Sequence, residues 1–231
     1  MEIRILKTIR TVSLILTLLL ILWVLFMILL TSGINENWTN ERYLQFAKEN
    51  GILYFLSYLN GVIFTVITMA LFGLLYIFIQ NEKPVLSIIG ILFVPVYGVL
   101  NIFAYGSQIT VVPQLLSEVN IEHLTECRAE YLVQWIQTKP ETAVGMINGV
   151  AYALLGIPSV CFGVALFKRI PFGMVVGWLL FINAILCLVG LIGYVIGNLT
   201  LANGIIAGGF LFTIAVFFMF IGFRVKVKQA T

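Results

Sequence analysis

The chain has 231 residues, of which 61% are hydrophobic and 10% charged, and its mean hydropathy is +1.08. Because soluble domains carry about 25% charged residues, this composition excludes a soluble globular protein and predicts a chain embedded in a bilayer. Six spans of about 20 residues leave little room for a separate soluble domain, so any activity must lie within the bundle or on its loops. The net charge of +3 is accounted for by the membrane orientation argued below, and we expect no nucleic-acid partner.

The apolar runs predict an all-α fold in which residues 1–231 form a single membrane domain, a polytopic bundle of six transmembrane helices. The first run follows Arg4, Lys7 and Arg10. It is too long for the apolar part of a signal peptide and lacks a small-residue cleavage site, so we expect it to be retained as a span. The six spans are expected at residues 11–30, 52–79, 85–105, 144–167, 172–195 and 201–223.

Two polar segments between the spans have helical periodicity. Glu41–Lys48 is predicted to be a short surface helix that carries Tyr43, Leu44 and Phe46. Residues 114–137, between spans three and four, repeat apolar residues at helical spacing with glutamates on the other faces, which predicts an amphipathic helix. We expect this helix to lie on the bilayer surface, and the alternative is a helix that binds a partner.

The charged residues are divided unevenly between the two sides of the predicted bundle. If the N-terminus is cytoplasmic, nine of the thirteen Lys and Arg residues lie on the cytoplasmic side, and eight of the ten acidic residues lie on the other side. Lys and Arg concentrate in cytoplasmic loops of membrane proteins. The sequence therefore predicts a multi-pass protein of the cell membrane with both termini cytoplasmic and the segment 114–137 outside.

An Asn-Gly pair recurs three times, at Asn60, Asn148 and Asn203, and each pair precedes the next basic residue by 20 to 23 positions. That interval corresponds to roughly 30 to 35 Å of helix, the thickness of one hydrocarbon core. Spans two and three also resemble spans four and five in the spacing of proline and glycine, which indicates duplication of a helical hairpin. The alternative is coincidence, since glycine and asparagine are common in such helices.

The predicted spans contain no ionisable side chain apart from tyrosine and cysteine, and the chain contains no aspartate. Proton relays, ion coupling and retinal linkage normally use intramembrane charges, so the sequence argues against all three. The single histidine, His123, lies outside the spans, and its i, i+4 pair with Cys127 lacks further ligands. Cys161 and Cys187 are predicted to fill the core. We therefore expect no catalytic residue, no metal and no cofactor, and an intramembrane enzyme is disfavoured.

Amides, hydroxyls and tyrosines remain as the polar groups of the spans. Hydrogen bonds between helices account for them without any ligand. The sharper hypothesis is an outward-facing polar pocket that binds a neutral or amphipathic molecule. Its candidate ligand-binding residues are Asn60, Asn101, Asn148, Asn183, Asn203, Tyr105, Tyr152 and Tyr194.

The patterns Tyr58-Leu59-Asn60-Gly61 and Leu71-Phe72-Gly73-Leu74, together with the polar insert before span four, add to the six spans and the inside termini. With these features the chain resembles uncharacterised prokaryotic six-span membrane proteins that are grouped as a domain of unknown function. The resemblance implies a six-span membrane fold and assigns no residue roles.

Two functions stay open from the sequence. The first is a membrane protein that binds, or transports, a small neutral or lipid-like ligand through its outward-facing pocket. The second is an accessory or interaction subunit of a larger membrane complex, such as the substrate-capture component of an importer, with another membrane protein as partner. The small close-packing residues that are usual in the first span of such components are absent from Thr11–Leu30.

Overall fold

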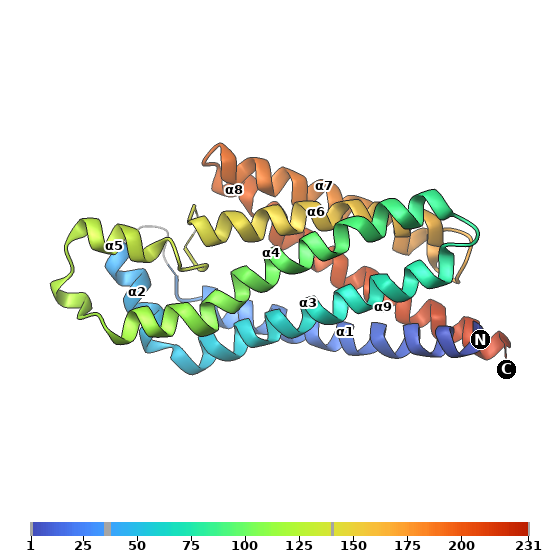
Figure 1. The fold of residues 1–231 in the computed structure, drawn as a ribbon, viewed down its shortest axis with the longest axis horizontal. Coiled ribbons are helices and arrows are strands. Elements are labelled where there is room, and N and C mark those ends of the chain that lie inside the picture. Colours follow the sequence, from blue (N-terminus) through green and yellow to red (C-terminus); the bar gives the residue numbers. More distant parts are fainter. Residues whose placement is uncertain (1, 35–37, 140, 231) are drawn as a thin grey trace.

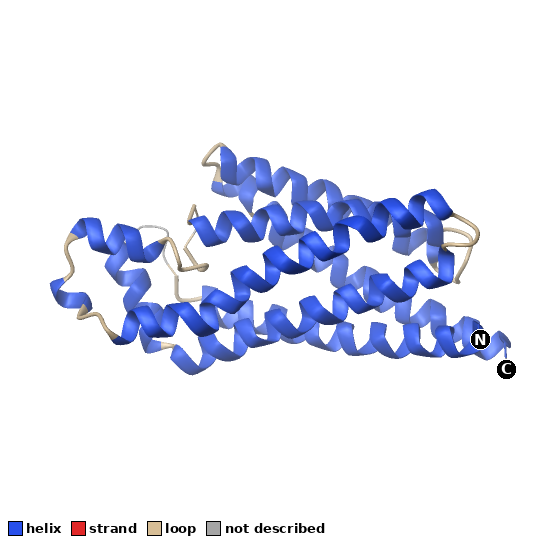
Figure 2. Cartoon of the chain, in the orientation of Figure 1, coloured by secondary structure: helices blue, strands red, loops and turns tan. Residues whose placement is uncertain are grey.

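The computed structural model describes residues 2–34, 38–139 and 141–230, and within these ranges all regular structure is helical (Figure 2). Six of the described helices are long and apolar enough to cross a membrane, which confirms the predicted all-α fold with six spans. The chain is a multi-span membrane protein. Its long helices are α1 (Glu2–Thr31), α3 (Gly51–Ile79), α4 (Pro84–Ser117), α6 (Ala143–Leu166), α7 (Gly173–Val195) and α9 (Gly204–Ala230).

The six long helices form a ring in chain order (Figure 1). α1 packs on α3, α3 on α4, α4 on α6, α6 on α7 and α7 on α9, and α9 closes the ring by packing on α1. α6 is the most buried of the six and also contacts α3 across the interior. A closed ring of this kind brings side chains from all six helices towards one axis.

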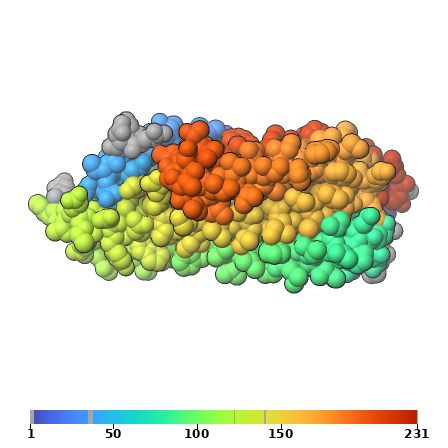
Figure 3. Space-filling view, turned by 90° about the horizontal axis from the view of Figure 1, so that it is seen from above, coloured from blue at the N-terminus to red at the C-terminus, as the bar shows by residue number. Residues whose placement is uncertain are grey.

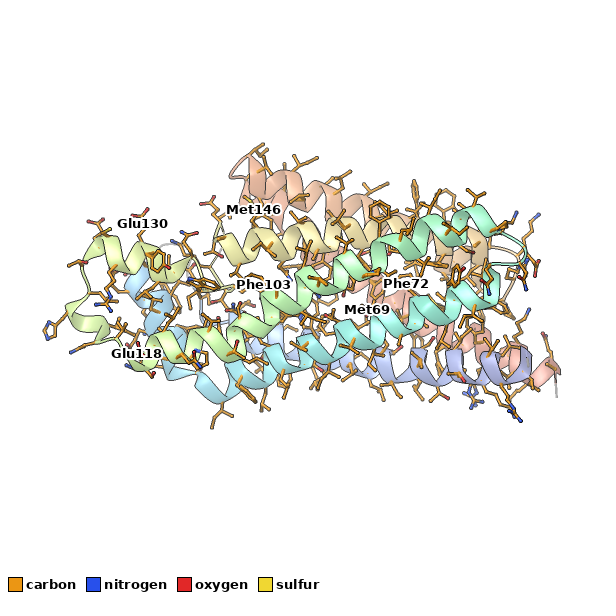
Figure 4. The ribbon with its side chains drawn as sticks, in the orientation of Figure 1. Met69, Phe72, Phe103, Glu118, Glu130 and Met146 are labelled. Carbon is orange, nitrogen blue, oxygen red and sulfur yellow. The ribbon has the colours of Figure 1, made fainter. Side chains whose placement is uncertain are left out.

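Polar side chains gather at the two ends of the bundle (Figure 4). One end, called here the termini end, holds both termini and the turns at 80–83 and 167–172 (Figure 1). The opposite end carries Glu118 and Glu130, whereas Met69 and Phe72 lie along the middle of α3 (Figure 4). The termini thus share one end, as an even number of spans requires.

At the termini end, the two turns are tied to each other and to α9. Arg169 forms an ion pair with Glu82, which joins the α6–α7 turn to the α3–α4 turn. Lys226 of α9 donates from Nζ to the carbonyl oxygen of Arg169 at 2.8 Å. Three segments that are distant in sequence therefore meet at this end.

The third span is longer than the sequence predicted. We expected it to end at Tyr105, but α4 continues to Ser117 and has 34 residues. At about 1.5 Å per residue the helix is about 51 Å long, which exceeds a hydrocarbon core of about 30 Å. The helix continues because Ser107 and Gln108 are buried and hydrogen-bonded inside the protein, so the polar residues that looked like a loop do not end it.

The prediction of one amphipathic helix over residues 114–137 is wrong. The segment contains the end of α4, a 3-10 turn (η1, Ile121–His123), a short helix (α5, Glu126–Val133) and a turn. These pieces fold back on α2 (Asn40–Glu49), so the apolar side chains of the segment bury one another instead of requiring one straight helix. We call α2, residues 112–117, η1 and α5 the cap, which projects beyond α8 (Leu199–Ala202) at one end of an elongated molecule (Figure 3).

The helix predicted at Glu41–Lys48 is present as α2, but its apolar face is not at the surface. Thr39 caps it by accepting a hydrogen bond from the backbone of Arg42, and Tyr43, Leu44 and Phe46 are buried. On its polar face, hydrogen bonds from Gln45 and Arg42 lower the pKa of Glu49. The cap is thus packed through buried apolar side chains that are continuous with the core of the bundle.

Candidate functional site: a polar cavity below the cap

A cavity of about 360 Å³ lies in the interior of the ring, on the side of the cap. Aromatic and amide side chains make its walls, and every one of the six long helices contributes to it. Its roof is formed by Tyr43 of α2 and by Gln137 and Thr138, which follow α5. At its deep end Trp23 and Tyr152 separate it from a smaller void of about 10 Å³.

Five of the eight residues predicted as ligand-binding line this cavity, namely Tyr105, Asn148, Tyr152, Tyr194 and Asn203. They come from α4, α6, α7 and the residue that precedes α9. The hydroxyl groups of Tyr105 and Tyr152 are hydrogen-bonded to each other at 2.7 Å. Residues far apart in sequence therefore surround one space.

Asn101 lies beside the cavity lining and not in it. Its Nδ2 donates to Oγ1 of Thr65 at 2.7 Å and to the hydroxyl of Tyr97 at 3.3 Å, and its Oδ1 accepts from Nδ2 of Asn148 at 2.7 Å. Asn101 is fully buried, so its own amide is not accessible to a ligand. Its role is to join α3, α4 and α6 behind the cavity wall, as hydrogen bonds between membrane helices commonly do.

Asn60 and Asn183 also lie outside the cavity. Asn60 donates from Nδ2 to the carbonyl of Leu19 at 3.1 Å and so joins α3 to α1. Asn183 borders the small void beneath Trp23, where its Oδ1 accepts from Sγ of Cys187 at 3.4 Å. Nδ2 of Asn183 has no partner among the described residues.

Two of the three Asn-Gly pairs position tyrosines of the cavity. A Cβ atom at Gly61 would lie 2.7 Å from the ring of Tyr105, and one at Gly149 would lie 3.2 Å from the ring of Tyr194. Since real Cβ atoms are not found as close as 2.7 Å, only glycine at position 61 lets the Tyr105 ring lie where it does. The glycine of each pair thus provides space, whereas Asn60 and Asn148 form hydrogen bonds between helices.

Gln108, which the sequence pattern did not mark as a candidate, connects the cavity wall to the roof. It is fully buried, and its Oε1 accepts from the hydroxyl of Tyr54 at 2.5 Å and from the backbone of Gln137 at 3.1 Å. Its Nε2 donates to the carbonyl of Trp135 at 2.8 Å. One amide therefore fixes α3, α4 and the roof segment relative to one another.

Several lining residues were also missed from the sequence, among them Trp23, Tyr43, Tyr58, Gln137 and Thr138. The position of Tyr58, two residues before Asn60, was the one available signal, since it belongs to the same motif. The roof residues gave none, because their place depends on how the segment after α5 folds back.

The lining of the cavity is uncharged. Among the described residues that line it, none carries a formal charge. Over the same described ranges, no three His, Cys, Asp or Glu residues lie close enough together to hold a metal ion. The lining offers aromatic faces, hydroxyl groups and amides, which can bind a molecule by stacking and hydrogen bonding.

Comparison with protein-family models, with curated proteins and with solved structures gives no match.

Proposed function

We propose that this protein binds a small uncharged or amphipathic molecule in the cavity below the cap. The observation that carries the proposal is the gathering of Tyr105, Asn148, Tyr152, Tyr194 and Asn203, from separate helices, around one space of about 360 Å³. Ligand-binding cavities usually have volumes of about 300 to 1,000 Å³ and an apolar lining with a few polar groups. The volume and the lining both fit that class.

The orientation of the bundle determines which side of the membrane the cavity serves. Since the termini end is rich in Lys and Arg, we place it in the cytoplasm, and the cavity then faces outward. Labelling with a membrane-impermeant thiol reagent tests this orientation. In a variant that retains only Cys127, which is exposed, the thiol should react from outside. A cysteine placed at Glu82 in a cysteine-free chain should not react, and its labelling from outside would contradict the orientation.

The binding itself is tested by extracting the protein together with its surrounding lipid and measuring bound molecules by native mass spectrometry. We expect one small molecule per chain in the wild type. In Asn203→Leu and Tyr194→Phe we expect a smaller bound fraction, because each removes a polar group of the lining and neither breaks a described side-chain hydrogen bond.

Gln114→Leu is the matched control, because Gln114 is exposed on α4 and does not line the cavity. It should retain as much ligand as the wild type. A wild-type chain that carries no small molecule would contradict the proposal. Recovery of a second membrane protein in its place would favour the accessory-subunit alternative.

A further inference from the structure

The roof of the cavity is held shut on the side of the cap. Nζ of Lys139, next to the roof residues Gln137 and Thr138, donates to Oδ1 of Asn40 at 2.5 Å and so ties the roof segment to α2. Oγ1 of Thr142 donates to the carbonyl of Ile136 at 3.1 Å and closes the same segment on itself. A ligand that arrived through the cap would have to break these bonds.

Five of the six helix pairs around the ring are joined tightly beside the cavity. Hydrogen bonds between side chains, or from a side chain to the backbone, join the first three pairs, and close packing at glycine joins the next two. In ring order these contacts are Asn60 to Leu19 (α3–α1), Asn101 to Thr65 (α4–α3), Asn148 to Asn101 (α6–α4), Gly149 to Tyr194 (α6–α7) and Gly190 to Ile205 (α7–α9).

The sixth pair, α1 and α9, is different. The two helices run together at the termini end and separate towards the cap end (Figure 1). The indole of Trp23 lies against Gly209, where an added Cβ atom would be 3.4 Å from the ring. Over the described residues 20–31 and 204–215, no side-chain hydrogen bond joins the two helices. Above Trp23 the cavity is bordered by Met27 and Thr31 on α1 and by Ile206 on α9, and Thr31 and Ile206 are exposed.

From this geometry we propose that the ligand is a single-chain, uncharged amphiphile that enters sideways from the bilayer between α1 and α9. The proposal rests on the proposed function and adds the ligand class and the route. The polar end of the ligand lies under the roof, where Oε1 of Gln137 and Oγ1 of Thr138 are buried and have the hydroxyls of Tyr105 and Tyr54 as polar neighbours. Buried polar atoms of this kind favour a ligand that brings hydrogen-bond donors.

The size of the cavity sets how much of the ligand it holds. At about 30 Å³ for a water-sized group, about 360 Å³ accommodates roughly a dozen non-hydrogen atoms. A glycerol ester and the first few methylenes of its chain fill that volume, and the remaining chain passes between Met27 and Ile206 into the lipid. A phosphate or ammonium head is disfavoured because the lining offers no opposite charge, and burying an unpaired charge is costly.

The test uses the full-length protein in phosphatidylcholine vesicles with a trace of a monoacylglycerol that carries a photoreactive diazirine near its ester. We expect crosslinks at cavity-lining residues that unlabelled monooleoylglycerol competes away. A lysophosphatidylcholine with the same diazirine chain should crosslink only at lipid-facing residues, because its head group is charged.

Met27→Trp and Ile206→Trp fill the gap between α1 and α9, and each should reduce the cavity crosslinks about tenfold, because a bulky indole then obstructs the route. Leu29→Trp and Ile214→Trp are the controls, since both positions are exposed on the same helices and do not line the cavity. They should crosslink as the wild type does.

The outcomes separate this proposal from the proposed function. Equal cavity labelling by both probes would overturn the ligand class, and undiminished labelling in Met27→Trp and Ile206→Trp would overturn the route. Absence of competed cavity labelling, while native mass spectrometry still finds a water-soluble molecule bound, would overturn this inference and leave the proposed function standing. Absence of both signals would overturn the two together.

Discussion

The two halves of the ring interior are filled in different ways. On the side of the cap, tyrosines and amides surround a cavity, and two pairs of them are joined by the Tyr105–Tyr152 and Asn148–Asn101 hydrogen bonds. On the side of the termini, phenylalanines fill the axis. The ring of Phe72 lies 5.4 Å from that of Phe162 and 6.4 Å from that of Phe212, measured between centroids.

The difference shows that one ring of helices can enclose a cavity at one end and a closely packed apolar interior at the other. A hydrogen bond to the hydroxyl of a tyrosine holds its ring at the wall of the cavity, so the space between the walls stays open. A phenylalanine has no such partner and packs against other apolar side chains. The protein is therefore arranged as a polar cavity above an apolar plug, and passage through the bundle would require the plug to rearrange.

The largest effect is expected from opening the plug. Phe162→Ala removes a fully buried ring on α6 and leaves a cavity, which should lower the free energy of unfolding by about 3 to 5 kcal/mol. Thermal unfolding in detergent measures this. Phe103→Ala, at an exposed ring on α4, should cost much less, and equal losses in the two variants would contradict a packed plug.

The next effect is expected where the site meets its roof. Gln108→Leu leaves the hydroxyl of Tyr54, the carbonyl of Trp135 and the amide of Gln137 without their partner. The unpaired groups should lower the free energy of unfolding by about 3 kcal/mol. Hydrogen–deuterium exchange should rise mainly in the segment around Gln137. Gln114→Leu, on the exposed face of the same helix, should change neither the free energy of unfolding nor the exchange. If Gln108→Leu also left both quantities unchanged, the roof would have to be held by other contacts.

A smaller effect is expected from moving one wall of the cavity. Gly61→Ala places a methyl group against the ring of Tyr105, so the ring must shift, and the shift disturbs its hydrogen bond with Tyr152. We expect a loss of stability of about 1 to 3 kcal/mol, together with weaker ligand retention. Gly73→Ala on the same helix meets nothing within 4 Å and is the matched control. Full ligand retention in Gly61→Ala would show that binding does not depend on the position of the Tyr105 ring.

The smallest effect is expected at the termini end. Glu82→Gln breaks the ion pair with Arg169, in which the Glu82 side chain is 57% exposed. Exposed pairs of this kind contribute about 0 to 1 kcal/mol, and salt weakens them. Thermal unfolding at low and high salt should differ less for Glu82→Gln than for the wild type. A loss of unfolding free energy in Glu82→Gln as large as that in Phe162→Ala would show that the ion pair, and not the packed phenylalanines, holds this half of the bundle together.

Composition and apolar length were enough to predict the six helices, because a membrane span must be long, apolar and helical to satisfy its backbone. They were not enough to predict where α4 ends, since Gln108 is compatible with a helix only because Tyr54 and Trp135 bond to it. The number of residues between each asparagine and the next basic residue predicted its depth in the membrane, but not the direction in which its side chain points. Asn101 and Asn183 therefore fell outside the cavity, whereas Asn148 fell in its lining.

An experimental structure of the protein in lipid nanodiscs would show whether the cavity below the cap binds a ligand. We expect non-protein density between Tyr105, Tyr194 and Asn148, with a chain that leaves between α1 and α9. A cavity that has collapsed, with Trp23 and Tyr152 filling the space and no density between them, would contradict this expectation.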